Sequence, residues 1–249
     1  MPRECSLMEG PGVRLIAENL QGFIGALLVS VYGNTRYLEE FERLEGSMLS
    51  RIVTFGKRLY LVFSAGTISV HFLMYGRYRI GEDLADPVRL GLRFNRGTLG
   101  FFNTSVHSLE DLPAFDSRID IMSPAWNGDL VYDRIRDSGG LICDLLLDQT
   151  VFAGVGNIIK NEALARAGVH PLSVTASIPP PVLKDLIEET RGFSLLFYRE
   201  KKEGHDIRDS CIVYGKRVCP SGTRVVQAKM GQRNRVTYVC EDGQVRYSS

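Results

Sequence analysis

The sequence contains no long hydrophobic run. No apolar stretch among its 249 residues approaches the roughly 20 residues that cross a bilayer, and the first residues lack the apolar core of a signal peptide. These two absences argue against an integral membrane protein and against a secreted one. We therefore expect a cytoplasmic protein that has no membrane partner.

The sequence also contains few cysteines and has a small net charge. Five cysteines stand at scattered positions, an odd number that does not make the disulfide framework of a small secreted domain. The 30 Lys and Arg nearly cancel the 29 Asp and Glu, so the net charge of +1 does not by itself indicate a nucleic-acid partner. Residues 191–249, however, carry 12 basic and 6 acidic side chains, against 18 and 23 in residues 1–190. A basic surface suited to nucleic acid is therefore expected at the C-terminal end.

The most informative stretch is residues 153–171, AGVGNIIKNEALARAGVHP. Gly154 and Gly156 precede a helical pattern, and both can adopt positive φ without a Cβ clash. The helix begins at Asn157, and Gly168 ends it. Such an entry points N–H groups and the positive end of the helix dipole outward, which suits a phosphate. The alternative is an ordinary helix cap.

A second predicted helix lies directly before this glycine turn. LICDLLLDQTVF (141–152) has the pattern of a compact apolar helix, so two helices meet through the glycine turn. This arrangement resembles the helix-two-turns-helix element of the Fpg/Nei (formamidopyrimidine-DNA glycosylase / endonuclease VIII) superfamily. The strings CDLLLDQ and GVGNIIKNEAL look most like its third vertebrate Nei-like type. The resemblance implies that Asn157 contacts the DNA backbone beside a damaged base.

The N-terminal residues bear on catalysis. The superfamily begins Met-Pro-Glu-Gly-Pro and uses the α-amine of the processed terminus as nucleophile, whereas here Glu9-Gly10-Pro11 follows Met8 and Pro2 lies further upstream. An α-amine has a reference pKa of about 7.7–8.0, so part of it is neutral and nucleophilic at neutral pH. The resemblance implies attack by the amine of Met8 or of Pro2, with proton transfer by Glu9. The alternative for Glu9 is a helix-capping acid.

Residues 26–121 alternate in short runs rich in β-branched and aromatic side chains, punctuated by Gly and Asn. This pattern predicts antiparallel strands, and the resemblance implies that they form the N-terminal β-sandwich of the superfamily. FGKRLYLVF (55–63) resembles the family hairpin whose Lys contacts the phosphate at the lesion, which implies that role for Lys57. A solvated Lys in a strand turn is the alternative.

HFLMYGR (71–77) resembles the family motif H-L-G-M-T-G-R, whose Met fills the gap left when the target base flips out of the helix. The resemblance implies that role for Met74, with packing in the sandwich core as the alternative. The family completes this wedge with an Arg and a Phe from a D-P-R-R-F-G loop, where this chain has FFNTSV (101–106). The incomplete wedge favours single-stranded or bubble substrates.

The C-terminal segment, residues 213–249, resembles the β-hairpin zinc finger of the family without its ligands. The family uses two C-x-x-C pairs, whose four thiolates surround the metal, but here Cys219 and Cys240 each have Gly in place of the second cysteine. We expect no metal and no other cofactor, and a hairpin held by strand pairing and apolar contacts. Cys211 and His205 are alternative ligands.

The sequence thus predicts a multidomain α+β protein. The predicted regions are a catalytic antiparallel β-sandwich at 1–122, a linker at 123–129, a helix-two-turns-helix DNA-binding domain at 130–210 and a zincless β-hairpin finger at 211–249. Predicted helices cover residues 130–137, 140–149, 157–167 and 179–202. In the finger, the resemblance places Arg235 in the DNA minor groove or over the flipped site, and the alternative is a generic basic hairpin tip.

The function implied is base-excision repair by a bifunctional DNA glycosylase and abasic-site lyase. It would remove oxidised bases through a Schiff base on an N-terminal amine and favour single-stranded, bubble or crosslinked DNA. The alternative is a non-catalytic damaged-DNA binding protein whose extended N-terminus disables the chemistry. An RNA or ribosomal partner is disfavoured because the sandwich and the finger match as well. We expect the working amine to be that of Met8, directly before Glu9, with Pro2 as the rival.

Overall fold

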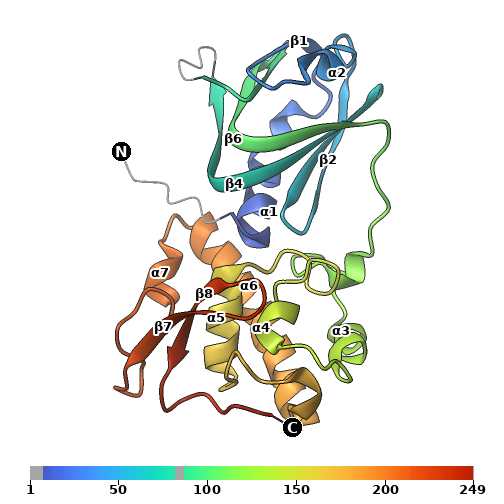
Figure 1. The fold of residues 1–249 in the computed structure, drawn as a ribbon. Helices are drawn as coiled ribbons and strands as arrows, with labels where there is room; N and C mark the ends of the chain where they lie inside the picture. Colours follow the sequence, from blue (N-terminus) through green and yellow to red (C-terminus); the bar gives the residue numbers. More distant parts are fainter. Residues whose placement is uncertain (1–7, 82–86, 249) are drawn as a thin grey trace. The chain divides into compact units, whose positions relative to one another are not determined.

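The computed structural model describes residues 8–81 and 87–248. The chain forms two compact units, residues 1–115 and 116–249. The first consists mainly of strands, and the second of helices followed by a hairpin (Figure 1). The predicted α+β class, with an antiparallel sheet before a helical part, is confirmed. Among the described residues no helix has the length and apolar character needed to cross a membrane.

One antiparallel sheet of six strands forms the first unit, in the order β1-β5-β6-β4-β3-β2. Two α-helices and a 3-10 turn accompany it in the described part of this unit. The elements are α1 (Gly10–Asn19), η1 (Gln21–Phe23), β1 (Leu28–Tyr32), α2 (Leu38–Glu42), β2 (Leu49–Phe55), β3 (Arg58–Phe63), β4 (Gly66–Gly81), β5 (Leu90–Phe94) and β6 (Gly97–Leu109).

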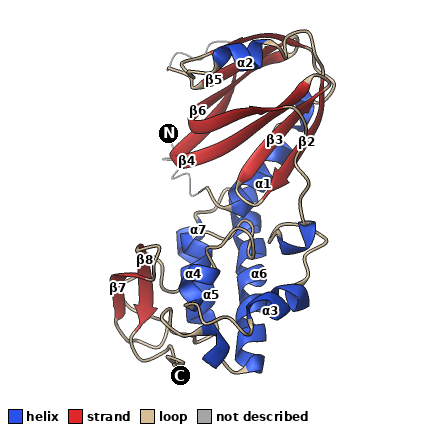
Figure 2. Ribbon diagram, turned by 45° about the vertical axis from the view of Figure 1, so that its right-hand side comes forward, coloured by secondary structure: helices blue, strands red, loops and turns tan. Residues whose placement is uncertain are grey.

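This sheet is strongly curled (Figure 2), and the segments leading into its two outer strands are joined. An antiparallel bridge joins Leu27, just before β1, to Met48, just before β2. Phe63 of β3 stacks on Phe94 of β5 with ring centroids 6.2 Å apart, although two other strands separate β3 from β5 in the sheet. That contact runs across the interior. The predicted sandwich is therefore a single sheet folded over its own core.

Helix α1 packs one apolar face on this core. Val13, Ile16 and Ala17 lie three and four residues apart, as one face of a helix requires, and all are at most 5% exposed. Pro11 lies in the first turn, where a helix has no intrahelical acceptor for its N–H groups. Figures 1 and 2 show the beginning of α1 at the same end of this unit as the turn between β2 and β3.

The second unit contains helices and a two-stranded hairpin. Its elements are η2 (Ser117–Ile119), α3 (Gly128–Ile135), α4 (Ile142–Leu145), α5 (Asn157–Arg166), η3 (Thr175–Ser177), α6 (Pro180–Lys202), α7 (Ile207–Ser210), β7 (Val225–Met230) and β8 (Arg235–Cys240). The helices predicted at 130–137, 157–167 and 179–202 agree with α3, α5 and α6 to within two residues at each end. The third of these, α6, packs against both α3 and α5.

The helix predicted over 140–149 was wrong in length, because α4 ends at Leu145. The amide of Leu147 donates to the carbonyl of Asp144 at 3.2 Å, three residues back rather than four, so the chain tightens into turns. The side-chain amide of Gln149 then donates to the carbonyl of Leu147 at 3.1 Å. The Gln149 side chain therefore replaces the main-chain amide that would donate to the Leu147 carbonyl in a longer helix.

The two units divide between Phe115 and Asp116, whereas the sequence placed the linker at 123–129. The segment after the division is bonded into the second unit. The amide of Ile121 donates to the carbonyl of Ala153 at 2.9 Å, and Arg191 of α6 donates to the carbonyl of Ser123 at 3.0 Å. The functions assigned to the predicted domains stay predictions.

Candidate functional site

Glu9 stands at the N-cap position of α1 and is only 6% exposed. Its main chain is extended, with φ −109° and ψ 175°, and its carbonyl accepts from the amide of Val13 at 3.1 Å. The carboxylate makes no capping hydrogen bond to the helix. The helix-capping alternative therefore does not describe this side chain. The fold holds a carboxylate almost out of water at the entry of α1.

Met8, one of the two predicted nucleophiles, directly precedes this carboxylate. Its side chain is half-buried and packs against the core of the first unit. Consecutive Cα atoms lie about 3.8 Å apart, so an amine on Met8 would be held beside Glu9. Pro2, the other predicted nucleophile, lies outside the described residues.

Lys57 lies in the two-residue turn between β2 and β3, where the sequence predicted a hairpin. Gly56 enters the turn with φ 56°, a conformation that glycine adopts without steric cost. The Nδ1 atom of His71 lies 3.2 Å from the carbonyl oxygen of Lys57. Burial lowers the pKa of His71, so the ring is neutral at neutral pH and Nδ1 donates its proton to that carbonyl. This bond fixes the main chain of the turn that carries Lys57.

Met74 is 68% exposed, so the alternative of core packing is wrong. The pairing of β4 with β6 shifts register between Phe72 and Arg77, and Met74 lies in the resulting bulge. The side-chain amide of Asn103 in β6 donates to the carbonyl of Met74 at 2.5 Å. The bulge therefore presents the Met74 side chain to solvent, as a wedge residue requires.

The glycine turn before α5 differs in one respect from the prediction. Gly154 adopts positive φ, 99°, but Gly156 is an extended N-cap with φ −119° and ψ −164°. The Gln149 side chain holds the turn, because its oxygen accepts from the amide of Gly154 and its nitrogen donates to the carbonyl of Val155, both at 3.0 Å. The sequence did not indicate this role of Gln149, because residue preferences for helix or strand do not predict side-chain hydrogen bonds across a turn.

Asn157 begins α5 and is half-buried. Its side-chain nitrogen donates to the carbonyl of Val236 in β8 at 2.9 Å, while its side-chain oxygen is buried and accepts no hydrogen bond from the described residues. Asn161, one helical turn later, accepts from the amide of Tyr238 at 3.1 Å. Asn157 thus anchors the hairpin to α5. Its contact with DNA stays a prediction.

The tip of the β7–β8 hairpin is held by a carboxylate of α4. Asp144 accepts from the amides of Gln232 and Arg233 at 2.9 and 3.1 Å. The Arg233 guanidinium lies 3.8 Å from Asp148. Arg235, at the start of β8, is exposed; its main-chain carbonyl accepts from the Thr237 hydroxyl at 3.0 Å, while no bond of its guanidinium is found among the described residues. Of these two arginines, Arg235 is the one available to a ligand.

The segment leading to the finger is fixed by a second buried carboxylate. Glu162 of α5 is fully buried and accepts from three consecutive amides, those of Ile212, Val213 and Tyr214, at 2.8 to 3.0 Å. The Arg166 guanidinium lies 3.7 Å from the same carboxylate. The finger is therefore attached to α5 at both its base and its second strand. The sequence did not identify Glu162, because its partners lie some 50 residues away.

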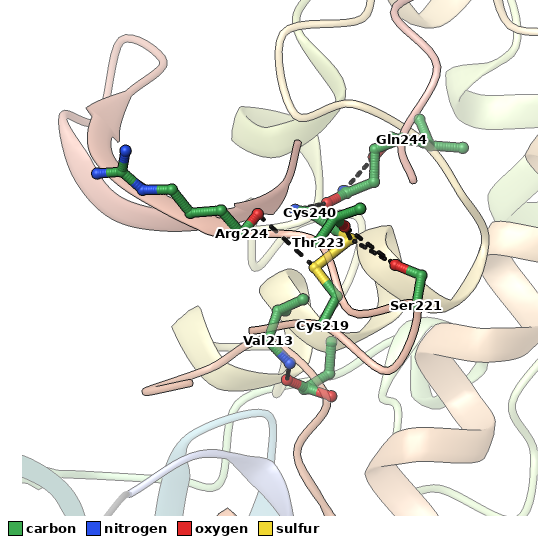
Figure 3. The surroundings of a disulfide bond; sticks show 9 residues. Val213, Cys219, Ser221, Thr223, Arg224, Cys240 and Gln244 are labelled. Atoms are coloured by element: carbon green, nitrogen blue, oxygen red, sulfur yellow. Dashed lines mark hydrogen bonds between the residues drawn. A yellow bond between two sulfur atoms is a disulfide. The ribbon is translucent and has the colours of Figure 1, made fainter. Parts of the chain in front are cut away.

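Cys219 and Cys240 form a disulfide bond, with Cα atoms 5.9 Å apart (Figure 3). The sequence predicted a finger without metal, in which each C-x-x-C pair has lost its second cysteine, and the structure joins the two remaining thiols. His205, an alternative ligand, lies 3.1 Å from Glu200, and among the described residues no group of three or more His, Cys, Asp and Glu side chains could hold a metal. These side chains do not fit a structural zinc ion, which needs four ligands.

Comparisons with known proteins agree with this arrangement. The family profile described as the formamidopyrimidine-DNA glycosylase H2TH domain matches residues 119–192. The chain is 32% identical over 207 residues to Endonuclease 8-like 3 of Mus musculus, and the match covers 78% of this chain and 34% of that protein. It is 34% identical over 198 residues to Endonuclease 8-like 2 of Bos taurus, covering 73% and 59%. The chain belongs to the Fpg/Nei superfamily.

The fold agrees with this membership. The crystal structure of Lactococcus lactis formamidopyrimidine-DNA glycosylase, bound non-covalently to DNA containing an AP site, matches with a TM-score of 0.83 at 20% identity, covering 96% of this chain and 100% of that one. The chain spans 34% of the length of the murine Endonuclease 8-like 3. The identity of 32% to Endonuclease 8-like 3 of Mus musculus confirms the resemblance to the third Nei-like type within the superfamily.

Within this Fpg/Nei fold the candidate site residues fall into two groups. The first unit carries Met8, Glu9, Lys57 and Met74, and the second carries Asn157 and Arg235. Asn157 bonds to the carbonyl of the residue that follows Arg235, so the structure brings these two together. Their roles toward DNA stay predictions.

Proposed function

We propose that this chain is a bifunctional DNA glycosylase and abasic-site lyase of base-excision repair that acts on oxidised bases. The observation that carries the proposal is Glu9, a buried carboxylate that does not cap its helix and directly follows a candidate N-terminal nucleophile. A positioned carboxylate can transfer protons to and from a reacting sugar, and the fold holds Glu9 in place at the entry of α1. The names of the relatives, Endonuclease 8-like 3 and 2, and the glycosylase domain profile support the same activity.

The proposed chemistry uses an amine and a carboxylate on adjacent residues. In a mature form that begins at Met8, the neutral amine of that residue attacks C1′ of the damaged nucleoside, the new C–N bond forms, and the glycosidic bond breaks with its electron pair leaving on the base. Glu9 protonates the ring oxygen, so the sugar opens and a Schiff base remains. Removal of a proton from C2′ then expels the 3′-phosphate by β-elimination. Water finally releases the amine from the cleaved product.

Three basic or polar side chains would position the strand. Lys57 and Asn157 would contact the phosphates beside the lesion, and Arg235 would enter the minor groove or cover the flipped site. The exposure of Arg235 and the fixed turn beneath Lys57 support these roles. Such phosphate contacts give affinity without sequence preference and make binding dependent on salt.

We further propose a preference for single-stranded, bubble or crosslinked DNA. Residues 101–106, where the superfamily motif supplies two more wedge residues, lie inside the continuous strand β6. The segment contains no Arg, and its two Phe side chains, Phe101 and Phe102, are buried, whereas Met74 is exposed. A base flips most easily from a single strand, where no opposite base needs support. We propose that the protein works as a monomer on damaged DNA in the cytoplasm, or at the nucleoid in a bacterium.

Borohydride trapping tests this function. The protein is incubated with a single-stranded oligonucleotide that carries an abasic site, and borohydride reduces any Schiff base to a stable adduct. We expect a covalent protein–DNA adduct and, without borohydride, cleavage at the abasic site. Tight binding without adduct or cleavage would instead identify the non-catalytic damaged-DNA binding protein.

A further inference from the structure

A cavity of about 450 Å³ lies at the base of the finger, within the second unit. Its walls come from α5, α6, the segment before the finger and the finger itself. Cys219 and Cys240, which form the disulfide, both line it. A cavity of this volume accommodates a small molecule. The disulfide therefore belongs to the wall of a site that a small molecule can enter.

Two charged side chains of opposite sign line the same cavity, Arg166 of α5 and Glu189 of α6. One nitrogen of the Arg166 guanidinium donates to the carbonyl of Ser210 at 2.9 Å. Its Nε atom is buried and donates no hydrogen bond to the described residues. A guanidinium binds a carboxylate well, and the Glu189 carboxylate can bind an ammonium group. The charges of the cavity therefore match those of a zwitterion.

The two sulfur atoms of the disulfide have different surroundings (Figure 3). The hydroxyl oxygens of Thr223 and Ser221 lie 3.1 and 3.7 Å from Sγ of Cys240. A disulfide sulfur carries no proton, so both hydroxyls are the donors. Sγ of Cys219 lies 3.9 Å from the carbonyl oxygen of Arg224, which disfavours negative charge on that sulfur. When the S–S bond breaks, its electron pair is therefore better stabilised on Cys240.

The main chain also holds the two cysteines differently. Cys240 ends β8, where it pairs with Val225, and its amide donates to the Gln244 side chain at 2.7 Å. Cys219 lies before β7, in a turn where its carbonyl accepts from the amide of Gly222 at 2.9 Å. A residue in such a turn changes its side-chain partner without breaking a strand ladder. Cys219 is therefore the cysteine suited to take a new sulfur partner.

We propose that this cavity is a thiol–disulfide exchange site for a small zwitterionic peptide thiol of the glutathione type. The thiolate of the peptide attacks Sγ of Cys219, a new S–S bond forms, and the bond between the two cysteines breaks with its electron pair on Cys240, which then takes a proton from water. The protein now carries a mixed disulfide on Cys219 and a free thiol on Cys240. Attack of a second peptide thiol on the bound peptide releases Cys219 as a thiolate. Two peptide thiols are thereby oxidised to one peptide disulfide, and the protein disulfide is reduced.

This exchange uses none of the residues assigned to the glycosylase reaction, so its test requires no DNA. Accessible free thiols of the 249-residue chain are blocked, reduced glutathione is added, and the thiols released are alkylated after increasing times. Mass spectrometry of the digest should find glutathione on Cys219 and the alkyl group on Cys240. Glutathione should open the disulfide faster than mercaptoethanol at equal thiolate concentration, because mercaptoethanol has no charges to pair with Arg166 and Glu189.

Thr223→Val tests the leaving sulfur. The variant lacks the hydroxyl nearest Sγ of Cys240, and we expect either thiol to open its disulfide about 10-fold more slowly, because a hydrogen bond to a developing charge is lost. Thr223→Ser keeps the hydroxyl and should restore the rate. Ser248→Ala is the matched control, since Ser248 is exposed and lies outside the cavity. Equal rates for Thr223→Val and Ser248→Ala would contradict the role given to Cys240.

Glu189→Ala tests the recognition of the peptide. We expect it to slow opening by glutathione about 2- to 5-fold and to leave opening by mercaptoethanol unchanged, which also shows that the variant is folded. Glu188→Ala is the control, because Glu188 is the neighbouring acid of α6 and does not line the cavity. The proposal is overturned if glutathione and mercaptoethanol open the wild-type disulfide equally fast, or if the glutathione adduct forms on Cys240.

Discussion

Glu9 is the residue at which the proposed chemistry is most directly open to test. Replacing it by Gln keeps the shape of the side chain but removes the proton transfer, so we expect Glu9→Gln to excise oxidised pyrimidines about 10²–10⁴-fold more slowly. Binding to an oligonucleotide that carries a tetrahydrofuran analogue of the abasic site should remain nearly intact. Single-turnover excision and fluorescence anisotropy measure the two effects, with Glu18→Gln as a control on the same helix. Excision by Glu9→Gln at the wild-type rate would mean that Glu9 has been misassigned.

Lys57 allows a similar test of the phosphate contact. We expect Lys57→Ala to weaken binding to all sequences alike and to lower the slope of log affinity against log salt by about one unit, because one phosphate contact is lost. Anisotropy titrations at several salt concentrations give this slope. Arg96→Ala is the matched control, since Arg96 is an exposed basic residue in another strand turn of the same unit. An unchanged slope for Lys57→Ala would place its side chain away from the DNA.

At the scale of elements, the attachment of the finger to α5 depends on Glu162. Glu162→Ala leaves three amides, one buried and two part-buried, without an acceptor, and the loss of a buried partner costs about 1–3 kcal/mol. We therefore expect the free energy of unfolding in urea to fall by about 3 kcal/mol or more, and by less in Glu162→Gln, which keeps one acceptor oxygen. Glu188→Ala, an exposed change on α6, is the control. Equal stability of Glu162→Ala and Glu188→Ala would contradict this account.

The finger itself is expected to be held by a disulfide and to contain no stoichiometric zinc. Thiol titration of the denatured protein should find two more thiols after reduction than before it, and Cys219→Ser should abolish that difference. Elemental measurement should find less than one zinc per chain, because two thiols cannot complete a tetrahedral site. Arg235→Ala should still weaken DNA binding in the presence of a chelator. One tightly bound zinc per chain would overturn this view.

Local sequence signals predicted the elements that local interactions form. Gly154 and Pro180 mark the beginnings of α5 and α6, because glycine and proline fix the backbone without help from distant residues. The early end of α4 depends instead on the side chain of Gln149, whose partners lie across a turn. The exposure of Met74 depends on Asn103 in another strand. Neither contact can be predicted from the residues that are adjacent in the sequence.

The disulfide could not be predicted from the hairpin pattern. Cys240 pairs with Val225 at the base of the ladder, and Cys219 lies before β7 begins. A turn in which the amide of Cys219 donates to the carbonyl of Thr223 at 2.8 Å folds this segment back. Strand alternation carries no signal for such a turn, so the pairing of the two cysteines had to come from the structure.

At the scale of the whole chain, the proposed activity needs residues of both units. The catalytic candidates lie in the first unit, and Arg235 lies in the second, which contains the basic C-terminal residues. The net charge of +1 hides this division, because the acidic excess of residues 1–190 cancels the basic excess of residues 191–249. Binding to DNA therefore depends on where the charge lies rather than on its sum.

The last prediction concerns which amine is the nucleophile. An amine on Met8 is adjacent to Glu9, whereas a chain that begins at Pro2 must order several more residues, at about 1–2 kcal/mol each, to bring its amine to the same place. We expect a version beginning at Met8 to form the borohydride adduct faster than the 249-residue chain. Its trapping rate should rise with pH up to about 7.7–8.0, because the amine must lose its proton before it attacks. Mass spectrometry of the digested adduct identifies the modified residue. The assignment would be refuted if the longer chain formed an adduct on Pro2 as fast as the shorter chain forms one on Met8.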